Sequence, residues 1–374
     1  MNRPEHAIVE VVAHPLVQRL EQPTQTSWGR YEAVSILVVE VRTASGVTGY
    51  GEGLARFAPH AYAALVRDAL VPRILGQDAL AIGANWGRMR RALSGRAGGM
   101  LAEAIAAVDI ALWDIAGKVA GMPLWRLLGG EGRRAVPVYA ASVNWAEDAA
   151  ADAAIDDFTA RGFDRIKIKI GGPVDAAIRR IARVRRRAGD AVTLYADANW
   201  AYRPDAAAEV GRALADHGYA WFEEPLRPED EDGYAALRAA CAVPLAAGES
   251  NYTLDQARAQ IEARVLSHAQ PNITRAGGLS ETRRIAEHAR AHDVAYAPHV
   301  GMSGILCEVA SLHLAAAQAN TSVLECACAP SRFKDGLADI APGYRRARDG
   351  MLAVPDGPGL GIEIDRDALA ALHA

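Results

Sequence analysis

The pattern of hydrophobic and polar positions changes near residue 130, which predicts two kinds of structure in one chain. Before that point, β-branched runs at 9–12 and 34–41 predict strands. Apolar residues at helical spacing follow over 61–75 and 100–120 and predict two helices. Strands grouped before helices are typical of an α+β module.

Beyond residue 135, short β-like segments alternate with helical stretches rich in alanine and arginine. The predicted strands are 136–142, 165–170, 192–197, 220–223, 245–249, 265–270, 294–298 and 322–326. About eight successive βα units predict a (β/α) barrel rather than an open sheet. The tail after 341 lacks this pattern and is expected to return to the first module. We therefore predict an α/β protein with a capping domain over 1–130, completed by 342–374, and a barrel domain over 131–341.

Polar side chains recur at the ends of the predicted barrel strands, where barrel enzymes carry their catalytic groups. From the second predicted strand onward, successive members lie 23 to 28 residues apart, which is the length of one βα unit. The set comprises Lys167 and Lys169, Asp197, Glu223, Glu249, Asn272, His299 and Glu325. Seven consecutive strands are thus expected to point polar groups toward one end of the barrel, here called the mouth.

Three carboxylates on adjacent predicted strands indicate a metal site. Asp197, Glu223 and Glu249 would repel one another without a cation, and hard carboxylate oxygens suit Mg²⁺. Glu224 directly follows Glu223, so strand alternation places it on the other face, and we expect it to be structural.

Lysine is rare in this chain, since only four of the 41 basic residues are lysines. Lys167 and Lys169 lie two residues apart on one strand face, predicted to be the barrel interior because isoleucines occupy the other face. A metal and a second ammonium are expected to lower a lysine pKa. We predict Lys169 as the general base and place Lys167 deeper, in contact with substrate or Lys169. An ion pair with a barrel carboxylate is the alternative for either.

Two histidine patterns are interpreted differently. His299 follows a later predicted strand, across the barrel from Lys169, and could exchange a proton near neutral pH, although a structural role is the alternative. His288 and His292 have the i, i+4 spacing that suits zinc. Their order is not His-Glu-x-x-His and they lie on an arginine-rich stretch, so we expect a solvated helix face.

Composition excludes several classes of protein. A net charge of −4 without a basic stripe argues against nucleic-acid binding. The N-terminus lacks a signal-peptide pattern, and no apolar run reaches the ~18 residues of a membrane span. The four cysteines are expected to be reduced thiols, as in a cytoplasmic protein, and no zinc-finger spacing is present.

The ordered motifs resemble those of the enolase superfamily, and within it the mandelate racemase subgroup. The matching stretches include Lys167-Ile-Lys169, Asp197-Ala-Asn199, Trp221-Phe-Glu-Glu-Pro225, Gly248-Glu249, Gln270-Pro271 and Pro298-His299. The resemblance implies an α+β cap on a (β/α)7β barrel of TIM type. It also implies Mg²⁺ on Asp197, Glu223 and Glu249, Lys169 as base and His299 as second acid/base. Glu325 would hydrogen-bond a substrate carboxylate oxygen.

One residue departs from the family pattern. Asn272 stands where the family usually has an aspartate paired with the histidine. We expect the amide oxygen to accept from Nδ1–H of His299 and orient the ring, without stabilising an imidazolium as a carboxylate does. This disfavours two-base racemisation and favours a one-way reaction.

The expected function is Mg²⁺-dependent removal of the proton α to a carboxylate, through an enediolate. Dehydration of an acid sugar to a 2-keto-3-deoxy acid is the main hypothesis. Alternatives are cycloisomerisation of a sugar-acid lactone, racemisation or epimerisation of a 2-hydroxy acid, and a catalytically silent binding protein. We expect a small carboxylate substrate, no nucleic acid or membrane partner, and a homo-oligomer.

Substrate specificity is expected to reside in the capping loops. Thr24 and Trp28 lie in one predicted loop, and Arg56, Phe57 and His60 in a second. Arg56 could hold a distal carboxylate through a bidentate contact, although a surface role is equally compatible. Asn199, beside the predicted metal ligand Asp197, is a further candidate for substrate binding.

Overall fold

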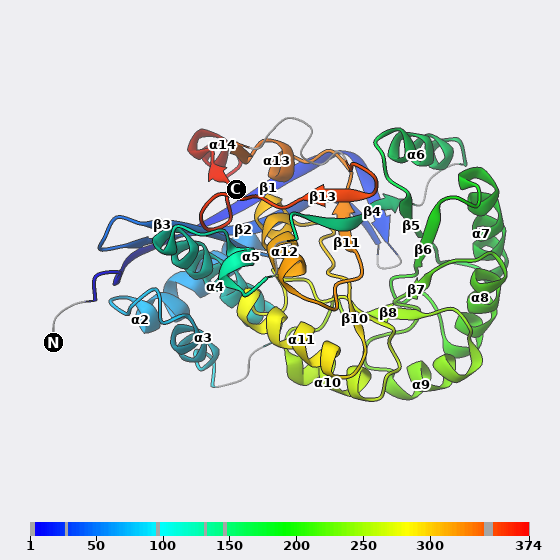
Figure 1. Ribbon diagram of the computed structural model, residues 1–374, viewed down its shortest axis with the longest axis horizontal. Coiled ribbons are helices and arrows are strands. Elements are labelled where there is room, and N and C mark those ends of the chain that lie inside the picture. The colour runs from blue at the N-terminus through cyan, green and yellow to red at the C-terminus, as the bar shows by residue number, and fades with distance from the viewer. Residues whose placement is uncertain are drawn as a thin grey trace.

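A computed structural model describes residues 4–26, 29–94, 98–130, 133–144, 148–339 and 347–373. Figure 1 shows an N-terminal α+β module beside a ring of barrel helices. Within the described ranges, no helix is both long and apolar enough to cross a lipid bilayer.

The N-terminal module is a three-stranded antiparallel sheet covered by helices. The strands, in sheet order, are β1 (Ile8–Thr26), β2 (Gly29–Thr43) and β3 (Thr48–Gly53). The helical segments are α1 (Pro59–Leu65), η1 (Val66–Leu70), α2 (Val71–Ile74), α3 (Ile82–Arg90), α4 (Gly99–Ala120) and α5 (Leu124–Leu127). Glycines alternate along β3, and a Cβ at Gly51 would meet the Ala107 carbonyl oxygen at 2.0 Å. The missing side chains let α4 lie directly on the strand.

The predicted helix over 61–75 is interrupted. A π-helical segment, η1, separates α1 from α2, and Pro72 lies in the first turn of α2. Proline has no N–H to donate to the preceding turn, so a regular α-helical hydrogen-bond pattern cannot continue through it. The helix predicted over 100–120 is confirmed as α4, and Gly121 terminates it in the left-handed conformation with φ 63°.

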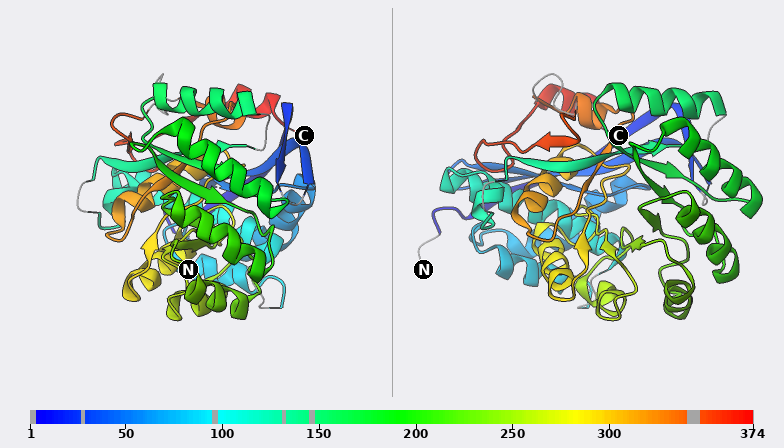
Figure 2. Two further views of the ribbon diagram at one scale, coloured as in Figure 1. Left: turned by 90° about the vertical axis from the view of Figure 1, so that its right-hand side faces the viewer. Right: turned by 45° about the vertical axis from the view of Figure 1, so that its right-hand side comes forward.

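Eight parallel strands within the described residues form the barrel sheet, with the order β10-β9-β8-β7-β6-β5-β4-β11. The strands are β4 (Ala135–Val143), β5 (Arg165–Lys169), β6 (Thr193–Asp197), β7 (Trp221–Glu223), β8 (Leu245–Ala247), β9 (His268–Ala269), β10 (Ala295–Tyr296) and β11 (Leu324–Ala327). The intervening helices are α6 (Asp148–Ala160), α7 (Val174–Ala188), α8 (Pro204–Asp216), α9 (Glu231–Ala240), α10 (Leu254–Glu262), α11 (Leu279–Ala291) and α12 (Ile305–Ala317). These helices follow one another round the outside of the sheet (Figures 1 and 2).

Backbone hydrogen bonds join the first and last strands of this order. The Ser322 amide donates to the Tyr296 carbonyl at 2.9 Å, and the Glu325 amide donates to the Pro298 carbonyl at 3.2 Å. The predicted fold class, a TIM-like barrel with an N-terminal α+β module, is confirmed.

The two faces of β5 have the predicted environments. Ile166 and Ile168 are fully buried within the large apolar core that includes residues of the surrounding helices. Inside the barrel, an aromatic layer of Tyr139, Tyr195 and Trp221 forms a floor, with the last two rings stacked 3.8 Å apart. Polar groups at the mouth therefore stand above a buried aromatic layer.

The C-terminal segment contacts both parts of the molecule. Its elements are α13 (Arg332–Asp335), β12 (Ala338–Asp339), β13 (Met351–Ala353), β14 (Glu363–Ile364) and α14 (Arg366–Ala371). β13 pairs antiparallel with β4 of the barrel, whereas the Val17 amide donates to the Leu372 carbonyl at 3.2 Å. Figure 2 shows α14 over the long N-terminal strands. The domain limits stay a prediction, and residues 131 and 341 lie outside the described ranges.

Candidate active site

Strand register brings the predicted polar residues together at the mouth. Lys169 pairs with Asp197 across β5 and β6, and Asp197 pairs with Glu223 across β6 and β7. Glu249 follows the end of β8 by two residues. Asn272 and His299 form a parallel bridge beyond β9 and β10. Parallel strands in register end at one edge, which explains why regular spacing in sequence becomes proximity in space.

Three carboxylates form a compact oxygen cluster. Asp197, Glu223 and Glu249 are buried, and one oxygen from each lies within 4.8 Å of the other two. Hard, anionic oxygens converging at this distance suit a small divalent cation such as Mg²⁺. The donor set therefore fits the metal that the sequence predicts.

Lys167 forms part of the barrel floor. Its side chain is fully buried, with Nζ 2.6 Å from Glu223 Oε1 and 3.0 Å from Glu325 Oε1. Nζ also lies 5.3 Å from the centre of the Tyr139 ring. Burial lowers its pKa, but the carboxylates of Glu223 and Glu325 outweigh burial and raise the pKa well above its ordinary value. These contacts favour the ion-pair alternative for Lys167 over contact with substrate.

Lys169 lies nearer the opening. Its side chain is 14% exposed, and Nζ contacts Asp197 and donates to Asn199 Oδ1 at 2.9 Å. Burial lowers the pKa of Lys169, but the Asp197 carboxylate outweighs burial, so the net direction is upward. Lys167 lowers this pKa as expected, and the further lowering by the charge of a metal stays a prediction.

Glu224 is closer to the carboxylate cluster than strand alternation predicts. It is buried, and its φ of 42° shows that the extended strand has ended before it. Burial raises its pKa well above the ordinary value, and the charges of Glu249 and Asp197 raise it further. The β7 strand has only three residues, so a two-residue period could not be extended to this position.

Asn272 faces His299 with its side-chain nitrogen, a donor, whereas the sequence analysis expected its oxygen to accept from the ring. Asn272 Oδ1 accepts from the Thr274 amide at 3.0 Å and from the Thr274 hydroxyl at 2.7 Å. Its Nδ2 therefore faces His299 Nδ1, at 3.1 Å. A main-chain N–H can only donate, so the amide orientation follows from the network. The ring accepts at Nδ1 and carries its hydrogen on Nε2.

His299 Nε2 faces the acidic side of the mouth. It lies 2.8 Å from Glu249 Oε2 and 3.5 Å from Glu325 Oε2. Burial raises the pKa of Glu249, but His299 and Arg56 outweigh burial and hold that pKa well below its ordinary value. The imidazole thus presents a donor, rather than a lone pair, to anything bound at the mouth.

Glu325 is held by backbone donors. Its Oε2 accepts from the Val300 amide at 2.7 Å and from the Gly301 amide at 2.9 Å. Burial raises the pKa of Glu325, but Lys167, His299 and the Val300 amide together lower it strongly. An ionised carboxylate only accepts hydrogen bonds. The role that the resemblance implies, donation to a substrate carboxylate, requires the protonated form of Glu325 and stays a prediction.

Two family models together cover most of the chain. Residues 149–368 match the enolase C-terminal domain-like family, and residues 8–129 match the mandelate racemase / muconate lactonizing enzyme N-terminal domain. The chain belongs to the enolase superfamily. Within it, the matches place the chain in the mandelate racemase subgroup.

Known members of the superfamily are similar along nearly their whole length. A D-galactarolactone cycloisomerase from Agrobacterium fabrum is 34% identical, covering 97% of each chain. A D-galactonate dehydratase from Xanthomonas campestris is 32% identical, covering 89% of this chain and 90% of that protein. A racemase from Streptomyces coelicolor with bound magnesium superposes with a TM-score of 0.90 at 30% identity, covering 98% of this chain and all of that one.

Two arginines lie near the mouth of this enolase-superfamily chain, one in a capping loop and one in a barrel loop. Arg56 Nη2 lies 3.7 Å from Glu249 Oε1, and the Arg56 side chain is 21% exposed. Arg275, which the sequence analysis missed, is mostly buried and lies 3.3 Å from Glu103. Its position three residues after Asn272, in a strand-to-helix loop, was the available signal.

The remaining capping candidates are not joined to the site. His60 is exposed in the first turn of α1, and among the described residues no hydrogen bond or ion pair links it to the carboxylates. Phe57 is 67% exposed and stacks on Tyr31, with ring centres 6.0 Å apart. Trp28 and the Thr24 side chain lie outside the described residues.

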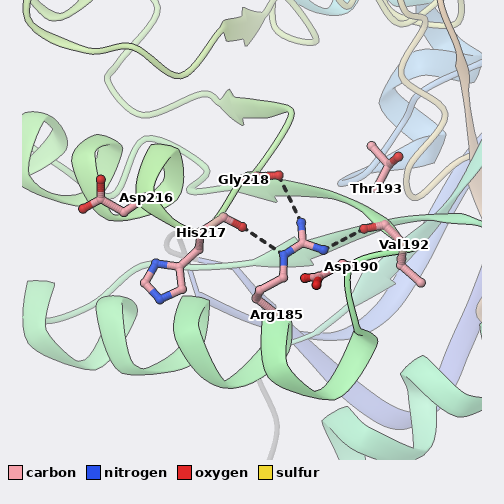
Figure 3. A pocket seen from close by; sticks show the side chains of 7 residues that line it. All are labelled: Arg185, Asp190, Val192, Thr193, Asp216, His217 and Gly218. Atoms are coloured by element: carbon pink, nitrogen blue, oxygen red, sulfur yellow. Dashed lines mark hydrogen bonds between the residues drawn. The ribbon is translucent and has the colours of Figure 1, made fainter.

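A surface pocket of about 460 Å³ lies at the opposite end of the barrel strands from the mouth. Arg185 occupies its centre and points its guanidinium at main-chain carbonyls (Figure 3). Arg185 Nε, Nη1 and Nη2 donate to the carbonyl oxygens of His217, Val192 and Gly218, at 2.9, 2.8 and 3.0 Å. These hydrogen bonds join α7 to the residues that follow α8 and to those that precede β6.

Proposed function

We propose that this protein is a magnesium-dependent acid-sugar dehydratase. It would remove the proton α to the substrate carboxylate and expel the β-hydroxyl as water, leaving a 2-keto-3-deoxy acid. The observation that carries this proposal is the position of Lys169 beside the carboxylate cluster at the strand ends. The dehydratase named among the superfamily relatives supports the choice of reaction.

Asp197, Glu223 and Glu249 would hold Mg²⁺, which supplies positive charge where negative charge develops on the substrate carboxylate. Lys169 would take the α-proton on Nζ as the free amine, which requires the charge of the metal to offset the upward effect of Asp197 on its pKa. Its partial exposure and its position at the mouth allow that contact, whereas Lys167 below it is fully buried. Asn199 would hold Nζ in place through its side-chain oxygen, which lies 2.9 Å away.

His299 would act from the other side of the mouth as a hydrogen-bond donor. With Nδ1 occupied by the Asn272 amide, the neutral ring would direct Nε2–H toward substrate oxygens and stabilise the departing β-hydroxyl by a hydrogen bond, while the Lys169 ammonium would return the proton that converts this group to water. This tautomer offers no lone pair at Nε2 for proton removal from the opposite face. Asn272 therefore supports a one-base reaction over racemisation.

Cycloisomerisation of a sugar-acid lactone is the second candidate. It is favoured by the 34% identity with a D-galactarolactone cycloisomerase over almost the entire chain. The same proton removal by Lys169 would be followed by cleavage of the bond between Cβ and the lactone oxygen. This opens the ring and keeps the oxygen in the product, whereas dehydration releases water. Product mass distinguishes the reactions, because the dehydration product weighs 18 mass units less than its substrate.

Arg56 is proposed to bind a second carboxylate or other anionic end of the substrate. Its guanidinium lies at the opening and contacts Glu249 through a 3.7 Å ion pair that is too long for a hydrogen bond. An anionic substrate group offers a shorter, bidentate contact. On this proposal, diacid sugars and their lactones would be the preferred substrates.

We also propose that the enzyme is a cytoplasmic homo-oligomer. The described cysteines are all free and buried, which suits a reducing compartment. Light scattering of the purified protein tests the subunit count.

Screening mono- and diacid sugars and their lactones with Mg²⁺ tests the proposed function. A 2-keto acid product, lost in Lys169→Ala, supports dehydration. A product of unchanged mass supports cycloisomerisation or epimerisation. Absence of both turnover and solvent exchange into every acid, together with absence of Mg²⁺ binding, would indicate a catalytically silent binding protein.

A further inference from the structure

A second group of metal-ligand side chains lies at the outer ends of two barrel helices. Glu262 is the last residue of α10, His288 lies in the last turn of α11, and His292 caps α11. One ligand atom from each residue lies within 4.8 Å of the other two. These helix ends lie at the opposite end of the barrel from the mouth, because each helix begins at the carboxyl end of its strand.

The two histidines have their ring nitrogens arranged for metal binding. His292 Nδ1 lies 2.9 Å from the main-chain oxygen of His288, so it carries the hydrogen and leaves a lone pair on Nε2. Metal-bound histidines usually donate their other N–H to a carbonyl or carboxylate in this way. His288 Nε2 lies 3.2 Å from Glu262 Oε1 and is buried, but it makes no hydrogen bond within the described residues.

We propose that Glu262, His288 and His292 bind a divalent transition-metal ion of the Zn²⁺ class. Two imidazole nitrogens and one carboxylate oxygen suit Zn²⁺, with water as the fourth ligand. The carbonyl ends of α10 and α11 add partial negative charge at the same place. The i, i+4 histidines put both rings on one face of α11, with centres 4.5 Å apart.

The sequence analysis considered His288 and His292 without Glu262, because Glu262 belongs to the preceding βα unit, at the end of α10. The interval of 26 residues between Glu262 and His288 matches the barrel repeat and places the two helix ends side by side. Arg258 lies 3.4 Å from Glu262 and competes for its oxygen, but its side chain is 53% exposed and can turn into solvent. A bound ion would clamp the outer ends of α10 and α11 together.

Titration with ZnCl₂ by calorimetry, in excess Mg²⁺ to load the mouth carboxylates, tests this proposal. His217→Ala is a matched control, because His217 Nδ1 also contacts the carbonyl of residue i−4, at 2.8 Å. Figure 3 shows its ring beside the Arg185 pocket, and His217 is not among the residues of the Glu262 cluster. The wild type and His217→Ala are expected to bind one more Zn²⁺ per chain than the His288→Ala/His292→Ala variant.

Two further measurements complete the test. Zn²⁺ should raise the melting temperature of the wild type and His217→Ala, but not that of the double variant. Glu262→Gln keeps both imidazoles and should weaken the additional site at least about tenfold. Equal Zn²⁺ stoichiometry and equal thermal shifts in the wild type and the double variant would overturn the proposal. Unchanged Zn²⁺ affinity in Glu262→Gln would show that Glu262 is not a ligand and would contradict the proposed three-residue site.

Discussion

The side-chain nitrogen of Asn272 lies 3.1 Å from Nδ1 of His299, while the Asn272 oxygen accepts two hydrogen bonds from Thr274. The Asn272 amide thus fixes the tautomer of His299, with the ring hydrogen on Nε2. An aspartate could retain the Thr274 bonds through one oxygen and accept from Nδ1–H through the other, placing the lone pair on Nε2.

Asn272→Asp is therefore expected to let His299 remove a proton from the face opposite Lys169. Turnover or Cα deuterium exchange of the opposite C2 epimer of an accepted acid sugar should rise at least about tenfold, since a positioned general base contributes 10²–10⁴-fold. Proton NMR in D₂O measures the exchange. A matched Asn272→Asp/His299→Ala variant should lose the gain. Equal exchange in the wild type and Asn272→Asp would contradict the tautomer assignment.

Asp197→Asn should impair the proposed magnesium site. The substitution preserves shape but removes one of three converging charges, and it also removes the carboxylate that contacts Lys169. Mg²⁺ affinity measured by calorimetry is expected to fall at least about tenfold. Treatment with EDTA should abolish turnover in the wild type, and added Mg²⁺ should restore it. Unaltered Mg²⁺ affinity would place the ion elsewhere.

Asp109 is expected to make stability depend on pH. It lies fully buried in α4 and accepts from the Ser280 amide and hydroxyl of α11, at 2.9 and 2.6 Å. Burial raises its pKa to about 7, so between its ordinary value of 3.8 and about 7 the folded state holds a proton that the unfolded state has lost. The stabilisation is full below that window and decreases as pH rises through it, by at most about 1.4 kcal/mol per pH unit.

Asp109→Asn removes this titration. The free energy of unfolding of the variant should vary less between pH 4.5 and 7 than that of the wild type, which denaturant titration at several pH values measures. Identical slopes would show that other groups account for the pH dependence.

Arg56→Ala should discriminate between substrates. If Arg56 binds a distal carboxylate, kcat/KM for diacid sugars should fall about tenfold to a hundredfold, the cost of a charge-assisted hydrogen bond. Monoacid sugars supply the internal control and should change much less. An equal fall for both classes would indicate that Arg56 acts through its contact with Glu249 instead.

The barrel and its polar mouth could be predicted from the sequence because one physical rule generates both. Each βα unit contributes one strand end, so residues such as Asp197 and Glu223 that recur at unit spacing must converge once the sheet closes. The two faces of β5 likewise followed from alternation, with Ile166 packed outward and Lys167 inward.

Other features depended on contacts that local spacing does not contain. The orientation of the Asn272 amide is set by Thr274, and carboxylates on β7 and β11 decide between an ion pair and a substrate contact for Lys167. Strand alternation, which the sequence analysis applied to Glu224, does not reach this residue because β7 ends after three residues. The Glu262 cluster joins two helices that the sequence analysis considered separately.

Solvent exchange at Cα tests the central claim most directly. Wild-type enzyme with Mg²⁺ and an accepted acid sugar in D₂O should form a 2-keto-3-deoxy acid or cycloisomer, or incorporate deuterium at C2, whereas Lys169→Ala should do none of these while still binding Mg²⁺. Retained product formation or exchange by Lys169→Ala would contradict the account, because another group would then be removing the proton.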